Sequence, residues 1–402
     1  MISPSKNILK QVCILHSKKV MDVLEIKIAV FKLCLDYFRL FSKGTKQEFA
    51  DRLKAIPGNS NIKIQTVNWF LKPSTKGSKM KKGIQRKILS INKVENFFRK
   101  DNRRFSEKFE ILNALSKQLA YFRTRNLLTI ISGNPLELYQ ESIHYNTFIV
   151  IFKYKYVTEQ VRRSVGFLFD YDEFSKKESI FSDDWGAYVL AEKLDVRSCL
   201  YCNRNYILTV TNTDDKIIRP EFDHFFPKSD HPILALSFYN LIPSCHICNS
   251  NLKGKKAFSL DNYFHPYLNS FDNENVKFTY EPTNPKAFFG DKRALKVKLD
   301  TTFIRRLKTQ IFGNINIFKL DEIYDYHQDI IVGFLDLQRK TNKKKVTDIF
   351  ENILVDSNGK KYAMNKKELY ELAIRNYYNE DDFYKRPLSK FERDIAIELK
   401  LI

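Results

Sequence analysis

The chain has 402 residues, of which 68 are Lys or Arg and 47 are Asp or Glu, for a formal net charge of +21. Its length allows two or three domains, and no apolar run approaches the roughly 20 residues that a membrane helix needs. The lysines in MISPSKNILKQVC stand where a signal peptide requires its apolar core, so we expect a cytoplasmic protein whose polyanionic partner is nucleic acid and not a membrane.

Residues 1–185 are predicted to form a mainly helical N-terminal domain, with a regulatory role or a role in binding nucleic acid or a partner. Residues 20–42 are typical of a buried helix, and apolar residues recur on one helix face from Phe105 onward. The segment 72–83 predicts an exposed loop, and residues 148–152 a short buried strand.

Residues 186–270 contain short extended segments. The stretches 206–212 and 217–225 flank a polar turn, which is typical of a hairpin. Residues 241–244 predict a third extended piece, and a short helix is expected to start after Cys248.

Residues 271–402 are predicted to form a mixed C-terminal domain. Residues 274–282 and 293–300 alternate as strands do, and residues 319–340 have apolar side chains at helical spacing. A closing amphipathic helix is expected after Pro387. The whole chain is therefore predicted to belong to the α+β class.

Four of the six cysteines form two C-x-x-C pairs, Cys199 with Cys202 and Cys245 with Cys248. Two such pairs at this separation are typical of a four-cysteine zinc site, and a reducing compartment would leave the thiols free for metal. Zinc held by four thiolates is structural, because a catalytic zinc keeps one position open. His246, inside the second pair, is a less favoured alternative ligand.

Polar residues of a second kind accompany the cysteines. The stretch PEFDHFFP contains Asp223, His224 and Pro227, Asn240 lies in YNLIP, and Asn249 directly follows the last cysteine. In this order, together with the two cysteine pairs, these residues resemble the HNH, or ββα-metal, endonuclease superfamily in its zinc-containing branch.

The resemblance covers roughly residues 195–260 and implies a role for each residue. It implies that His224 is the general base and that Asp223 and Asn249 bind Mg²⁺ or Mn²⁺ through oxygen atoms. Asn240 would fix the loop that aims His224. A regular strand points Asp223 and His224 to opposite faces, so their convergence on one site follows from the resemblance alone.

Basic residues near the motif are candidates for binding the substrate. Some members of the superfamily have a third metal ligand, a histidine, where this chain has Lys253. We expect Lys253, Lys255 and Lys256 to contact nucleic-acid phosphates. Glu221 either supports the metal ligands without touching the ion or is an ordinary solvated carboxylate, and the second is favoured. Further basic runs occur at 76–83, 99–104 and 339–345.

The sequence thus predicts a metal-dependent HNH endonuclease, with DNA favoured over RNA as substrate. The resemblance implies an effector of a bacterial anti-phage (antiviral) defence or mobile-element system, regulated by a partner such as an ATPase. Two alternatives stay open: a non-catalytic zinc protein that binds nucleic acid, and a toxin that cuts RNA with the same site.

Overall fold

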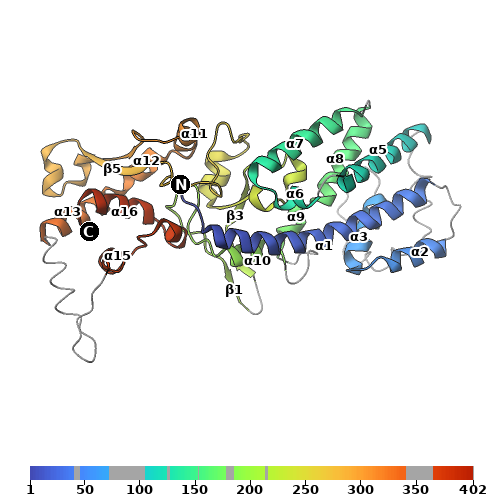
Figure 1. The fold of residues 1–402 in the computed structure, drawn as a ribbon, viewed down its shortest axis with the longest axis horizontal. Coiled ribbons are helices and arrows are strands. Elements are labelled where there is room, and N and C mark those ends of the chain that lie inside the picture. Colours follow the sequence, from blue (N-terminus) through green and yellow to red (C-terminus); the bar gives the residue numbers. More distant parts are fainter. Residues whose placement is uncertain are drawn as a thin grey trace, which may run out of the picture. The chain divides into compact units, whose positions relative to one another are not determined.

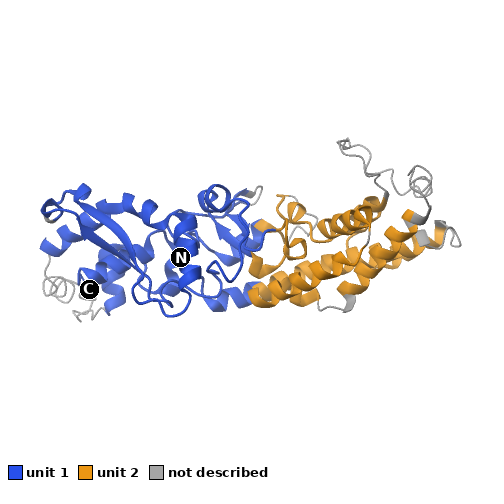
Figure 2. Cartoon of the chain, turned by 90° about the horizontal axis from the view of Figure 1, so that it is seen from above, with its two compact units in different colours: residues 1–12, 188–227, 241–402 blue, residues 13–187, 228–240 orange. Residues whose placement is uncertain are grey.

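A computed structural model describes residues 1–39, 46–71, 105–124, 127–152, 154–177, 185–212, 216–340 and 365–401. The chain divides into two units (Figure 2). Unit 1 comprises residues 1–12, 188–227 and 241–402, and unit 2 comprises residues 13–187 and 228–240. The predicted loop at 72–83 and the basic runs at 76–83 and 99–104 lie outside the described residues. The predicted division into three domains with separate roles stays a prediction.

Unit 2 is helical in its described residues (Figure 1). Its elements are α1 (Lys6–Arg39, of which residues 6–12 are counted with unit 1), α2 (Lys46–Ala55), α3 (Ser60–Leu71), α5 (Phe105–Thr124), α6 (Leu127–Ser132), α7 (Pro135–Val150), α8 (Lys155–Leu168), α9 (Tyr171–Phe174) and the 3-10 turns η2 (Pro232–Leu234) and η3 (Phe238–Asn240). The helices predicted at 20–42 and from Phe105 are confirmed within these bounds, and α1 begins well before the predicted start.

The strand predicted at residues 148–152 is wrong, because residues 148–150 are the end of α7. That helix begins with a capping box: the Asn134 side chain accepts from the backbone N–H of Glu137, and the Glu137 carboxylate accepts from the N–H of Asn134. Pro135 lies in the first turn of the helix, where a backbone N–H would have no acceptor within the helix, so its missing N–H loses no hydrogen bond. The apolar run at 148–150 is thus the last part of a helix that begins at Pro135, whereas the run by itself fits either a helix or a strand.

In its described residues, unit 1 contains three two-stranded antiparallel sheets. The pairs are β1 (Val210–Thr211) with β2 (Lys216–Ile218), β3 (Glu221–His224) with β4 (Leu241–Ser244), and β5 (Lys277–Pro282) with β6 (Leu295–Asp300). The predicted extended segments are confirmed at these places. The stretch 217–225 is split into β2 and β3 at Pro220, which has no N–H to donate to a ladder.

Helices and turns of unit 1 stand before, between and after these strands in the sequence. They are α10 (Ala187–Leu194), the π-helix η4 (Ile247–Lys253), the 3-10 turns η5 (Pro285–Phe289), η6 (Lys292–Ala294), η7 (Asp325–His327) and η8 (Glu380–Lys385), and the helices α11 (Lys308–Phe318), α12 (Leu320–Tyr324), α13 (Gln328–Lys340), α15 (Lys366–Ile374) and α16 (Ser389–Glu398). The predicted closing helix is confirmed as α16. The single helix predicted at 319–340 is instead α12, η7 and α13.

The β5–β6 ribbon is the centre of one hydrophobic core. Strand β5 lies against α16, and β6 lies against α12 and α13 (Figure 1). The buried side chains include Phe278 and Val297 of the ribbon, Tyr324 of α12, Ile331 of α13 and Phe391 of α16. The mixture of a small antiparallel sheet with covering helices agrees with the predicted α+β class.

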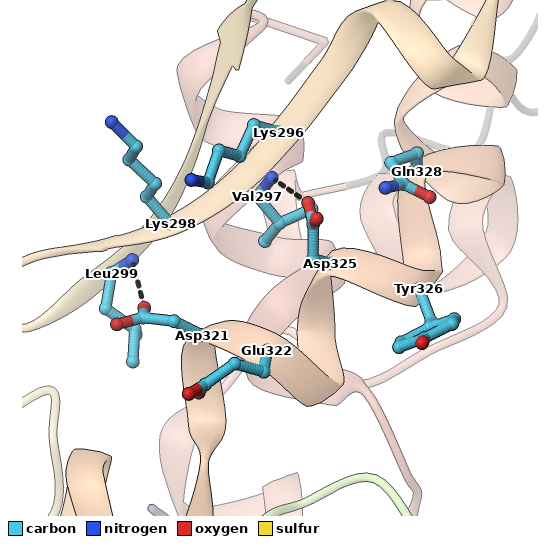
Figure 3. Close-up of a pocket in the computed structure, with 9 residues that line it drawn as sticks. All are labelled: Lys296, Val297, Lys298, Leu299, Asp321, Glu322, Asp325, Tyr326 and Gln328. Carbon is cyan, nitrogen blue, oxygen red and sulfur yellow. Dashed lines mark hydrogen bonds between the residues drawn. The ribbon is translucent and has the colours of Figure 1, made fainter.

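Both outer edges of this ribbon are hydrogen-bonded to carboxylates. On β6, Val297 N donates to Asp325 Oδ1 at 2.8 Å and Leu299 N donates to Asp321 Oδ1 at 3.2 Å (Figure 3). On β5, Phe278 N donates to Asp394 Oδ2 at 3.0 Å. Aspartate side chains thus accept the hydrogen bonds of these outward N–H groups, which a third strand would otherwise accept.

Candidate functional site

The four predicted cysteines lie close together. Their sulfur atoms are all within 4.8 Å of one another, and all four residues are buried. Tetrahedral zinc with bonds of about 2.3 Å to sulfur places the ligands about 3.8 Å apart. The cluster is therefore compatible with a zinc site, as the spacing of the cysteines predicts.

Backbone and side-chain N–H groups point at these sulfur atoms. Arg204 N donates to Cys202 Sγ at 3.4 Å, Cys245 N donates to Cys199 Sγ at 3.3 Å, and Asn205 Nδ2 donates to Cys245 Sγ at 3.3 Å. Hydrogen bonds of this kind favour the thiolate, which is the form that binds metal.

Asn203 fixes the turn after the first cysteine pair. Its φ is 51°, a left-handed conformation that asparagine tolerates, and Asn203 N donates to Cys199 O at 2.7 Å. Its buried amide donates to Ser198 Oγ, and Lys390 N donates to its Oδ1. Sequence reasoning missed this residue, although an asparagine directly after a C-x-x-C pair indicates a tight turn.

Asp223 is buried between the first cysteine pair and η4. Its Oδ2 accepts a hydrogen bond from Tyr201 at 2.6 Å, and its Oδ1 lies 2.7 Å from Lys253 Nζ. The exposed fractions of the Lys253 and Asp223 side chains are 2% and 4%. Lys253 Nζ also donates to His224 O at 2.5 Å. Each Asp223 oxygen thus already has a partner within unit 1.

Glu221 stands two residues before Asp223, on the same face of β3. Its Oε1 lies 2.7 Å from His246 Nδ1, and its Oε2 accepts from Asn249 Nδ2 at 2.8 Å and from Ser250 Oγ at 3.1 Å. Burial alone would raise the pKa of Glu221, but the hydrogen bonds from His246, Asn249 and Ser250 outweigh it and hold the pKa below its ordinary value.

The spacing of β3 and η4 explains why these contacts form in pairs. Residues two apart on a strand lie about 6.6 Å apart on one face, and residues about one turn apart lie on the same side of a helix. Asn249 and Lys253 of η4 therefore meet Glu221 and Asp223 of β3, respectively. A π-helix of this kind is rare and often occurs at functional sites.

The remaining predicted residues lie as follows. His224 is half-buried, is the last residue of β3 and pairs with Leu241 of β4, without a bulge in the register. Asn240 belongs to unit 2, where it is buried and donates from Nδ2 to Leu234 O at 3.0 Å. Lys255 and Lys256 are exposed. The roles assigned to these residues stay predictions.

A cavity of about 620 Å³ lies elsewhere in unit 1, along β6 and the turn from α12 to η7 (Figure 3). Its lining combines Lys296 and Lys298 with Asp321, Glu322 and Asp325. Asp321 and Asp325 are the residues that cap the β6 edge. The lining includes none of the predicted site residues, so we assign the cavity no part in the predicted site.

No protein-family model, curated protein or solved structure gives a significant match to this chain. Among the described residues, every helix is too short or too polar to cross a lipid bilayer.

Proposed function

We propose that the chain is a metal-dependent endonuclease of the HNH type, with DNA favoured over RNA. The observation that supports the proposal is the arrangement of β3, β4 and η4. Strands β3 and β4 pair antiparallel, η4 follows β4 directly, and side chains of β3 and η4 meet beside the four-cysteine cluster. A role in anti-phage defence or a mobile element, with a partner such as an ATPase, remains a prediction from the resemblance.

The four cysteines are proposed to bind one structural Zn²⁺. The donor set fits, because the four buried sulfur atoms lie within 4.8 Å of one another and N–H groups donate to three of them, those of Cys199, Cys202 and Cys245. Such an ion would join the first cysteine pair, which precedes β1, to the second pair, which follows β4.

The proposed catalytic ion is a different case. Mg²⁺ or Mn²⁺ would supply charge stabilisation to the phosphate and an activated water, and carboxylate and amide oxygens are suitable donors for it. Asn249 fits this role by chemistry and position. Asp223 does not fit it in the observed arrangement, because a cation there would have to displace the buried Lys253 ammonium, which lies 2.7 Å from its Oδ1, as well as the hydrogen bond from Tyr201.

The residues of the chain support hydrolysis in two ways. His224 is the proposed general base, since an imidazole can accept a proton from water near neutral pH. Lys255 and Lys256 are exposed just after η4 and are proposed to attract the nucleic-acid backbone.

The buried Asp223–Lys253 pair favours one rival function, because it gives Asp223 a structural role. In that case the chain is a non-catalytic zinc protein that binds nucleic acid. An RNA-cleaving toxin would use the same proposed site as the endonuclease, so the choice of substrate separates it from the main proposal.

The test is a cleavage assay on the full-length protein with plasmid DNA, single-stranded DNA and tRNA, in Mg²⁺, Mn²⁺ or EDTA at low salt. We expect metal-dependent cleavage that falls about 100-fold or more in His224→Ala. His144→Ala, an exposed histidine on α7, is the matched control and should cut like the wild type.

Equal cutting by the wild type and His224→Ala would refute the assignment of the base. Equal binding of nucleic acid without cutting of any substrate would support the binding protein instead. Cutting of tRNA alone would support the toxin.

A further inference from the structure

We propose that Glu221, and not Asp223, is the carboxylate that binds the divalent cation, together with Asn249. This inference deepens the proposed nuclease function and rests on it. It assigns a metal ligand that the motif does not indicate, and it gives Asp223 a structural role.

The negative charge of Asp223 already has a positively charged partner inside unit 1. Its Oδ1 lies 2.7 Å from Lys253 Nζ and its Oδ2 accepts from Tyr201 at 2.6 Å. A divalent cation at this carboxylate would have to displace a buried ammonium, which would then lose its counter-charge away from water. Lys253 also donates to His224 O and lies 4.7 Å from the centre of the Phe258 ring, so several contacts hold it in place.

Glu221 has the opposite surroundings. Its side chain is 39% exposed, and its partners are an amide, a hydroxyl and an imidazole that is itself 67% exposed. Replacing these hydrogen bonds by a hydrated cation leaves no buried charge without a partner. The exposed side of the carboxylate also leaves room for the phosphate oxygens and waters that complete the coordination of Mg²⁺ or Mn²⁺.

The neighbours of Glu221 supply the rest of the site. Asn249 Nδ2 donates to Oε2, and rotation of this amide when the cation displaces the hydrogen bond would present its side-chain oxygen, a hard ligand, to the same cation. His246 lies beside Oε1 and acts as a positioning residue that orients the carboxylate. The three residues come from β3 and from the turn that contains the second cysteine pair, so a bound zinc would also position this site.

The experiment measures Mn²⁺ binding to the zinc-loaded full-length protein by electron paramagnetic resonance, in which the signal of free Mn²⁺ falls as the ion binds. We expect Glu221→Gln to weaken Mn²⁺ binding at least tenfold. Glu281→Gln, an exposed glutamate on β5 paired with Lys298, is the matched control and should bind Mn²⁺ like the wild type.

Two further variants keep the result independent of folding. The double variant Asp223→Asn, Lys253→Met removes both buried charges together and should bind Mn²⁺ within twofold of the wild type. Asn249→Asp adds a carboxylate beside Glu221 and should tighten Mn²⁺ binding severalfold, a gain that misfolding cannot produce. Zinc content and circular dichroism check the fold of each variant.

Unchanged Mn²⁺ binding in Glu221→Gln would overturn the inference, as would its loss in the double variant or an absence of binding in the wild type. If the wild type cuts nucleic acid while Glu221→Gln binds Mn²⁺ normally, the inference fails and the proposed function stands. If Mn²⁺ binds through Glu221 but no nucleic acid is cut, the metal site stands and the nuclease proposal fails.

Discussion

His16 is buried in unit 2 with its ring surrounded by aromatic side chains. Its Nε2 lies 2.8 Å from Leu236 O, and the rings of Phe174, Trp185 and Phe238 lie with centroids 5.7 to 5.9 Å away. Burial lowers the pKa of His16 from 6.5 to about 4. The folded chain therefore keeps this imidazole neutral at a pH where the unfolded chain protonates it.

This pKa difference predicts acid sensitivity of unit 2. The unfolded state binds a proton near pH 6.5 and the folded state only near pH 4, so the stabilisation present above pH 6.5 is lost as the pH falls toward 4. Relative to His16→Phe, the wild type should lose about 2 kcal/mol of unfolding free energy between pH 7 and pH 5. Urea denaturation followed by tryptophan fluorescence measures it, because Trp69 and Trp185 both lie in unit 2. Parallel pH profiles of the two proteins would contradict this account.

Asp223 and Glu221 show what a sequence motif can and cannot convey about single residues. The strand that holds them follows from the extended pattern, and their shared face follows from its period of two. Their different surroundings depend on Lys253 and Asn249, which approach from η4. A π-helix changes which side chains share a face, and no local pattern in ICNSNLK indicates one.

The β5–β6 ribbon depends on carboxylates that replace neighbouring strands. Phe278 and Leu299 stand directly opposite each other in the two strands. The backbone N–H of each residue donates away from the partner strand, to Asp394 and Asp321 respectively, so the two residues do not hydrogen-bond to each other. Asp325, at the start of η7, accepts from Val297 N on the β6 edge.

We therefore expect Asp325→Ala to lower the unfolding free energy of unit 1 by about 1–3 kcal/mol, since a charge-assisted hydrogen bond to a partly buried N–H is lost. Asp336→Ala on α13 removes only exposed ion pairs with Arg339 and Lys340 and should change it by less than about 0.5 kcal/mol. Urea denaturation followed by circular dichroism compares the two. Equal stability of both variants would show that the edge bond contributes nothing.

At the level of elements, the sequence pattern located segments better than it located their ends. The segment 319–340 has continuous helical spacing, yet Lys319 adopts a left-handed conformation and Asp325 to His327 form a 3-10 turn. That turn places the Asp325 carboxylate on β6, a tertiary contact that overrides the local preference for one helix. The cysteine cluster was predictable because metal-type spacing encodes a long-range contact directly.

At the scale of the whole molecule, zinc is expected to determine the stability of unit 1. Structural zinc binds four-cysteine sites with about 10–16 kcal/mol at neutral pH, which is comparable to the entire stability of a domain. Removing it with a chelator, or replacing Cys199 by Ser, should release one equivalent of zinc and raise amide hydrogen exchange by at least 100-fold over residues 199–212, 216–227 and 241–253, which belong to unit 1. Cys13→Ser, outside the cluster, should keep the zinc. A metal-free protein with unchanged exchange in these segments would contradict the zinc assignment.

The order of segments in unit 1 has a consequence for protein synthesis. Residues 1–12 are made first, but the unit to which they belong also needs residues 188–227 and 241–402. Translation at about 5–20 residues per second separates the first and second cysteine pairs by about 2–9 seconds. During that interval the nascent chain has two thiols without their partners, and β3 has no β4 to pair with. The proposed site cannot assemble until the ribosome has passed residue 253, so a shorter nascent chain lacks part of the residues that we propose to bind metal.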